Sequence, residues 1–182
     1  MQLSNSCPRR LIGATAIACA AVLIPAAALA ATASPAAPAA TAGTPRCATS
    51  GLDIWLNPDG GGGWAGGFGY ALEFTNLSGR ACTLNGYPGV SAVNLNGHQL
   101  GSPATWDKVF KPHLVTLASD ATATAGVLVP DASNGGCARV FTAAGLRVYP
   151  PGQTRSKVVT YPFRECGMSV LPVKSSPIQL NG

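Results

Sequence analysis

The chain has 182 residues, of which 47% are hydrophobic and only 10% are charged, and its formal net charge is +5. This balance excludes a wholly disordered chain, because such chains combine low hydrophobicity with high charge. With 7 acidic residues and 2 histidines, the chain has few groups for acid–base catalysis or for a carboxylate-rich metal site. The length fits one domain with appended segments.

Residues 1–30 have the organisation of a secretory signal peptide. A short polar start ends in Arg9-Arg10, an apolar run follows at 11–24, and residues 28–30 (Ala-Leu-Ala) form a small-x-small cleavage pattern. The run of 14 residues is shorter than the roughly 20 of a membrane-spanning helix, so no stable membrane span is expected. Two alternatives stay open: lipidation at Cys19, which would anchor the protein, and a twin-arginine export signal.

A tether and a single domain are expected after the signal peptide. Residues 31–46 consist mainly of Ala, Pro and Thr, which predicts a disordered linker. Residues 47–182 are predicted to form one folded domain, since this length is sufficient for an independent core. The protein is therefore expected to be secreted, extracellular or associated with the cell wall.

Four cysteines remain in the predicted domain: Cys47, Cys82, Cys137 and Cys166. An even number in an exported chain predicts two disulfides. The point midway between the first two lies in the Gly-rich segment 60–67, and that between the last two lies in the Pro-Pro-Gly turn 150–152. Residues equidistant from a hairpin turn face each other, which favours these two pairs. The nested pairing, first with fourth and second with third, stays open. No Cys-x-x-Cys pair is present, so no zinc or other metal site is predicted.

Short runs with apolar residues at every second position recur through the domain and predict half-buried strands. One run is 52–57, and in another the side chains at even positions from Phe68 to Phe74 are expected to face inward. Asn96-Gly97 predicts a hairpin with a type I′ turn. Further strands are expected at 81–84, 90–95, 98–100, 109–110, 114–117, 122–129, 140–141, 146–149, 158–161 and 168–173.

Together these runs predict an all-β fold, an immunoglobulin-like antiparallel β-sandwich, because short strands alternate with Gly- and Pro-rich turns. No stretch shows a sustained helical period. A small closed β-barrel is the alternative.

Residues 81–90, Ala-Cys-Thr-Leu-Asn-Gly-Tyr-Pro-Gly-Val, resemble the actinobacterial secreted domain-of-unknown-function family numbered 4232. Other matching segments follow in the family's order: Phe74-Thr75-Asn76 before this one, then 115–117 (Val-Thr-Leu), 146–151 (Leu-Arg-Val-Tyr-Pro-Pro) and 170–173 (Val-Leu-Pro-Val). The resemblance covers about 47–173. It implies a secreted or envelope-attached β domain with no established activity and no catalytic residues to carry over.

Motifs of nucleotide or hydrolytic chemistry are poorly supported. Residues 61–66 fit the letters G-x-G-x-x-G, but a strand rather than a helix follows, so no nucleotide cofactor is expected. The sequence contains no Gly-x-Ser-x-Gly nucleophile elbow with which His98 or His113 could act. Both histidines are therefore expected on solvent-facing loops. Asp53 and Glu73 fall out of phase with the apolar positions, which predicts a solvent-facing location, with Glu73 near a cation such as Arg80.

Basic residues are frequent in the last third of the chain and are expected to form a solvated basic face: Arg139, Arg147, Arg155, Lys157 and Arg164. A face of this kind could contact an anionic wall polymer. It lacks the interleaved aromatic residues and the charge density of a nucleic-acid site, so no nucleic-acid partner is predicted.

Trp64, among the glycines of segment 60–67, is the candidate ligand-contact residue, because exposed Trp side chains often anchor partners. The alternative is that it folds back over the edge of the sandwich. The predicted function is a non-enzymatic binding or interaction module for a cell-wall polymer or a secreted protein. An extracellular protease inhibitor that uses loop 149–155 or 85–90 is the alternative. A secreted hydrolase is the least supported.

Overall fold

A computed structural model describes residues 43–133 and 137–175. Apart from a 3-10 turn at Thr49–Gly51, its regular structure consists of β-strands. The predicted signal peptide, the candidate lipidation site at Cys19, and residues 31–42 of the predicted linker lie outside the described residues and stay predictions.

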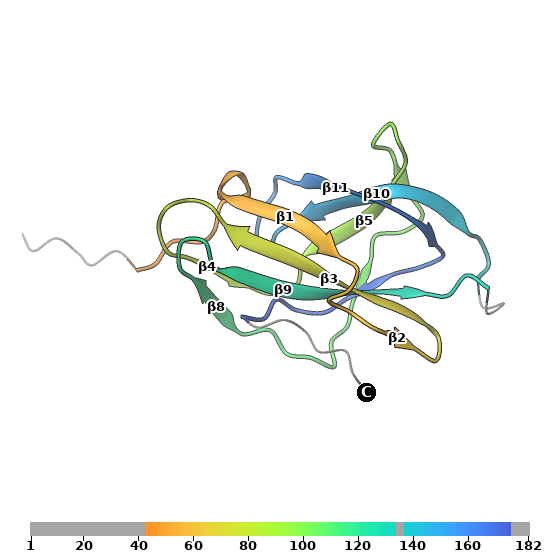
Figure 1. Cartoon of the computed structure of the whole chain (residues 1–182), viewed down its shortest axis with the longest axis horizontal. Helices are drawn as coiled ribbons and strands as arrows, with labels where there is room; N and C mark the ends of the chain where they lie inside the picture. Colours follow the sequence, from red (N-terminus) through yellow and green to blue (C-terminus); the bar gives the residue numbers. More distant parts are fainter. Residues whose placement is uncertain (1–42, 134–136, 176–182) are drawn as a thin grey trace, which may run out of the picture. The chain divides into compact units, whose positions relative to one another are not determined.

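The larger sheet has six strands in the order β1-β3-β9-β12-β7, with β2 paired to the start of β3 (Figure 1). Its pairs are antiparallel except that of β7 with β12, which is parallel. The strands are β1 (Leu52–Asn57), β2 (Gly63–Trp64), β3 (Gly67–Asn76), β7 (Thr105–Trp106), β9 (Thr122–Pro130) and β12 (Ser169–Val170).

The second sheet has four strands in the order β11-β10-β5-β6, and β4 pairs with β8 in a separate two-stranded ribbon. Over the part of the chain that the structure describes, each sheet keeps free edges, so the fold is a β-sandwich and not a closed barrel. The strands are β4 (Cys82–Asn85), β5 (Gly89–Val93), β6 (Gln99–Leu100), β8 (Leu114–Leu117), β10 (Phe141–Tyr149) and β11 (Lys157–Glu165).

The core forms where the apolar positions of the sheets meet. Alternate residues of β1 are buried, as its sequence pattern predicts. Leu72 and Phe74 of β3 are fully buried in the same core cluster as Leu146 and Val148 of β10. Burying each such side chain contributes about 1.5–3 kcal/mol, so the period-two pattern accounts for the packing of the sheets.

Only part of the predicted inward face of β3 is buried. Leu72 and Phe74 are buried and Tyr70 is half-buried against the core, but Phe68 is 51% exposed, so its expected burial is wrong. Phe68 lies on the same side of the sheet as the others, because every second residue of a strand shares a face. It lies at the end of the sandwich, where it lines an open pocket instead of the core.

The hairpin between β5 and β6 is present, but its turn is not type I′. That turn needs a positive φ at both central residues, and Asn96 does not have one, whereas Gly97 has φ +75°. Instead the Gly97 N–H donates to the carbonyl of Asn94, whose side chain accepts the N–H groups of Asn96 and His98. These bonds describe a type I turn followed by a left-handed glycine, which lengthens the loop by one residue.

Two other predicted strands differ from the structure. Residues 109–110 lie in a turn, and the nearby strand is β7 at Thr105–Trp106. Of residues 168–173, only Ser169–Val170 form a strand, although Leu171 and Val173 are also buried.

Both disulfides join the favoured pairs. Cys137–Cys166 closes the open end of the β10–β11 hairpin, in agreement with the turn at 150–152. Cys47–Cys82 arises differently, because the β1–β3 hairpin ends at the pair Leu52 and Asn76 and both cysteines lie beyond it.

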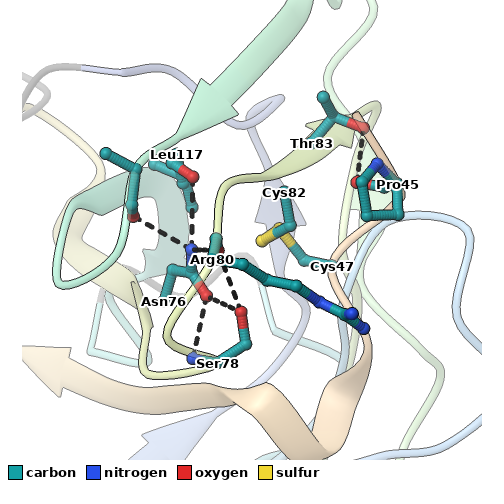
Figure 2. Close-up of a disulfide and its surroundings, with 9 residues drawn as sticks. Pro45, Cys47, Asn76, Ser78, Arg80, Cys82, Thr83 and Leu117 are labelled. Carbon is teal, nitrogen blue, oxygen red and sulfur yellow. Dashed lines mark hydrogen bonds between the residues drawn. A yellow bond between two sulfur atoms is a disulfide. The ribbon is translucent and has the colours of Figure 1, made fainter. Parts of the chain in front are cut away.

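The segment that carries Cys47 runs parallel to β4 (Figure 2). The Cys47 N–H donates to the Thr83 carbonyl at 3.0 Å, and the Thr83 N–H donates to the Pro45 carbonyl at 2.8 Å. The first disulfide therefore fastens the start of the domain to the β4–β8 ribbon.

Candidate functional site

Two large aromatic side chains are exposed on a short hairpin at one end of the larger sheet. Its strands, β2 and the start of β3, pair Gly63 with Phe68 and Trp64 with Gly67, and Figure 1 shows it projecting from the sheet. Trp64 is 44% exposed and Phe68 is 51% exposed. Because paired residues share a face and adjacent pairs alternate, the two side chains lie on opposite faces of the hairpin.

Two glycines of this hairpin, Gly61 and Gly67, are required by close backbone packing. A Cβ at Gly67 would lie 2.2 Å from the Val129 carbonyl oxygen, and one at Gly61 would lie 1.9 Å from that of Gly69. Both distances are impossible for real side chains. The Gly69 N–H also donates to the Gly62 carbonyl at 2.7 Å. The close packing of Gly61 against β3 and of Gly67 against β9 therefore holds the hairpin in place.

Trp64 was predicted either to be exposed for ligand contact or to fold back over the sandwich edge, and it does both in part. Its indole lies over the turn, where Cβ atoms at Gly66 and Gly67 would come within 3.1 Å of Nε1 and 2.8 Å of Cζ2, respectively. Trp64 also borders a cavity of about 250 Å³ with Gly62, Gly63 and Leu128, and it is 44% exposed. The ring is thus folded back and partly presented to solvent.

A second pocket, of about 260 Å³, lies on the Phe68 side of the hairpin. Phe68 and Tyr70 of β3 line it, together with residues 129–133 and 162–164. Asp131 accepts hydrogen bonds from the N–H and the hydroxyl of Ser133, both at 2.8 Å. These two bonds, with a smaller contribution from Arg164, lower the pKa of Asp131, so this aromatic-walled pocket carries a carboxylate that stays ionised.

A third pocket contains a buried carboxylate that sequence reasoning missed. Glu165, at the end of β11, is only 1% exposed, and its Oε1 accepts the N–H of Gly167 at 2.7 Å. No hydrogen-bond partner for Oε2 is present in the described ranges 43–133 and 137–175. Burial raises the pKa of Glu165, and the bond from Gly167 offsets only part of this effect.

The chain was compared with known families, curated proteins and solved structures. The family described as "Domain of unknown function (DUF4232)" matches residues 47–177. The chain belongs to this family. No match was found among curated proteins or among solved structures.

In the described part of this DUF4232 protein, no helix has the length and hydrophobicity to span a membrane. Within the same residues, no three or more His, Cys, Asp or Glu side chains are grouped where they could hold a metal ion.

The remaining candidate residues of the DUF4232 domain are distributed over its surface, except one. His98, His113 and Asp53 are exposed. Glu73 is buried, and its predicted solvent-facing location is wrong. It lies on a central strand, where its neighbours in register are Trp55 of β1 and Thr124 of β9, and its Oε2 accepts the Thr124 hydroxyl at 2.6 Å.

The cations of the last third contact separate parts of the chain. Arg147 donates to the Gly97 carbonyl at 2.6 Å, and Lys157 donates to the Leu52 carbonyl. Arg139 lies over the ring of Phe141, with 5.6 Å from Cζ to the ring centroid. Three of the five predicted basic-face residues therefore contact other parts of the fold.

Proposed function

We propose that this DUF4232 domain is a non-enzymatic binding module of the extracellular space, which binds a polysaccharide of the cell envelope through its β2–β3 hairpin. The observation that carries the proposal is the pair of exposed aromatic side chains, Trp64 and Phe68, on one hairpin held by close backbone packing. Aromatic side chains are enriched at binding hot spots, and a preformed surface loses little entropy when it binds.

The two hairpin pockets support a saccharide as the ligand. Each has a volume near 250 Å³ and an aromatic wall, from Trp64 on one face and Phe68 on the other. The Phe68 pocket adds the Asp131 carboxylate and Arg164. These groups can accept and donate hydrogen bonds, as the hydroxyls of a sugar require.

An extracellular location is supported by the two disulfides, because such bonds persist in oxidising compartments. The predicted signal peptide at 1–30 and linker at 31–46 would deliver the domain to the envelope and give it reach from an attachment point.

Parts of the two loops considered for a protease inhibitor are buried against the sandwich. Pro88, Pro150 and Pro151 are buried, and the ring of Tyr87 stacks on Trp106 with 5.4 Å between centroids. Inhibitory loops must enter a protease cleft, so no observation favours this function over the binding module.

The test is cosedimentation of the exported protein with insoluble cell-wall polysaccharide. The double variant Trp64→Ala/Phe68→Ala should bind at least about tenfold more weakly, a loss of about 1.4 kcal/mol. The matched control is Trp106→Ala, which removes another exposed Trp, 55% exposed, from β7. Equal binding by wild type and the double variant, or binding only to a secreted protein, would overturn the proposal.

A further inference from the structure

Exposed apolar side chains gather in the segment 106–114, which runs from the end of β7 to the start of β8. Four of the ten large hydrophobic residues that are exposed in the described part of the chain lie in these nine positions: Trp106, Val109, Phe110 and Leu114. Val109 is 83% exposed. Single exposed apolar residues are ordinary on a protein surface, whereas a group of them marks an interaction site.

Contacts with the rest of the domain hold this segment in place. The ring of Tyr87, which packs against the core, stacks on Trp106 with 5.4 Å between centroids, and its hydroxyl donates to the Phe110 carbonyl at 2.5 Å. The Asp107 carboxylate accepts the Val109 N–H at 3.0 Å, within the turn that follows β7. The aromatic side chains are therefore presented on a preformed surface, which loses little entropy when it binds.

Three lysines give the same surface a positive charge. Lys108 and Lys111 are exposed, and Lys174 Nζ lies 4.9 Å from the centroid of the Phe110 ring. Asp107 is the acidic residue of the segment, so three lysines minus one carboxylate leave a net charge of +2 with His113 neutral. We call this set the β7–β8 surface, defined by Trp106, Lys108, Val109, Phe110, Lys111 and Lys174.

We propose that the β7–β8 surface docks on a bilayer that contains anionic phospholipid. Trp106, Val109 and Phe110 then lie at the boundary between headgroups and acyl chains, and the lysines meet the lipid phosphates. A soluble polyanion would pair with the lysines, but it has no apolar phase to cover Val109. Lysine is depleted in the cores of protein–protein interfaces, whereas here lysines flank the apolar residues on both sides. A lipid surface therefore fits both features.

The experiment is cosedimentation of the intact exported protein with vesicles of phosphatidylglycerol and phosphatidylcholine in equal parts, beside vesicles of phosphatidylcholine alone. Binding should be at least about tenfold stronger on the anionic vesicles, because each lysine close to an anionic membrane strengthens binding roughly fivefold. Raising the salt concentration should weaken this binding, since salt screens exposed charges. Equal binding to the two kinds of vesicle, or binding to neither, would overturn the proposal.

A pair of matched variants tests the charges. Lys108→Gln/Lys111→Gln should weaken binding to the anionic vesicles at least about tenfold. The control is Arg80→Gln/Arg155→Gln, which removes the same net charge at two exposed positions outside the β7–β8 surface and should bind as the wild type does. Equal losses in the two double variants would show that only the net charge of the protein matters, which would contradict the proposal.

The apolar residues separate a bilayer from a soluble polyanion. Val109→Ser/Phe110→Ser should also weaken vesicle binding at least about tenfold, because these side chains leave water only in a lipid phase. The control Leu95→Ser/Val158→Ser changes two exposed apolar residues elsewhere and should have no effect. Binding that depends on the lysines but not on Val109 and Phe110 would identify a polyanion as the partner and refute the lipid surface.

Trp106 fluorescence gives a readout that leaves the β7–β8 surface intact. The chain has three Trp residues, so Trp55→Phe/Trp64→Phe retains Trp106 alone. Its emission should shift to the blue on anionic vesicles and be quenched by brominated lipid; unchanged emission from sedimented protein would contradict insertion. Trp64→Ala/Phe68→Ala should keep vesicle binding, and Trp106→Ala should keep polysaccharide binding, so failure of this proposal is distinguishable from failure of the hairpin proposal.

Discussion

Asn76, at the end of β3, is the most heavily bonded buried side chain near the first disulfide (Figure 2). It is 0% exposed. Its side-chain N–H groups donate to the carbonyls of Arg80 at 2.8 Å, Leu117 at 3.2 Å and Ala118 at 2.9 Å. Its oxygen accepts the N–H of Ser78 at 3.1 Å and the Ser78 hydroxyl at 2.7 Å. One side chain thus joins the β3–β4 turn to the β8–β9 turn.

Replacing Asn76 by Ala should destabilise the domain by about 3–5 kcal/mol. The Arg80 carbonyl keeps a bond from the Ser78 hydroxyl, and the Ala118 carbonyl keeps one from the Ala121 N–H at 3.2 Å, so the buried group that loses most is the Leu117 carbonyl. Loss of the amide donor costs about 1–3 kcal/mol at this buried carbonyl, and each of the other lost bonds costs about 0.5–1.5 kcal/mol. The sum is a large part of the 5–15 kcal/mol that stabilises a typical domain.

Asn76→Asp separates the donor bonds from the shape of the side chain. An ionised Asp keeps the acceptor for Ser78 but turns a negative oxygen toward three carbonyls, so its pKa should be raised in the folded state. The variant's stability should therefore recover in acid and fall as the pH rises through that pKa.

Urea unfolding followed by Trp fluorescence measures both effects, with comparable m-values required. The control is Asn94→Ala, which removes two bonds from an exposed loop and should cost about 1 kcal/mol. If Asn76→Ala is no less stable than this control, Asn76 does not hold the turns together.

Three further predictions concern other parts of the fold. Gly67→Ala should cost more than about 2 kcal/mol because its Cβ would meet the Val129 carbonyl at 2.2 Å, whereas Gly63→Ala, with 3.9 Å to its nearest atom, should be neutral in thermal unfolding. Cys47→Ser should lower stability by about 3–4 kcal/mol for a 35-residue separation, seen as a lower Tm; an unchanged Tm would contradict it. Because burial raises the pKa of Glu165, wild-type stability should fall as the pH rises from the ordinary pKa of 4.5 through the raised one. Glu165→Gln should lack this fall, and parallel profiles would refute the burial of its charge.

The local pattern of the strands was accessible from the sequence, because each strand records its buried face in alternate residues. In β1 this phase is correct throughout, and in β3 it predicts the burial of Leu72 and Phe74. The same pattern cannot tell where the opposite sheet ends, so Phe68 was placed in the core although it lines an open pocket.

Strand order and the geometry of the first disulfide depend on contacts between distant segments. The parallel pairing of β7 with β12 joins residues more than sixty positions apart, and each strand has only two residues, too few for a periodic signal. Spacing gave the correct partner for Cys47 because the β1–β3 hairpin brings the chain back toward its start. It did not reveal that the bond connects to β4 rather than across the hairpin.

Charged residues were the hardest to place from sequence. Glu73 was expected at the surface from its phase, but a central strand has neighbours on both sides, and Trp55 and Thr124 flank it. Glu165 had a usable signal, because it shares the inward phase of Val159 in β11. Its polarity and its place beside a cysteine obscured that signal.

The buried polar side chains differ in whether the chain supplies their hydrogen-bond partners. Asn76 has its side-chain hydrogen bonds met by the chain, and Oε2 of Glu73 accepts the Thr124 hydroxyl. Glu165 is equally buried, but its Oε2 has no hydrogen-bond partner among the residues that the structure describes. A Leu at position 165 would fill this space without a desolvation cost, so stability alone gives no reason for a carboxylate there.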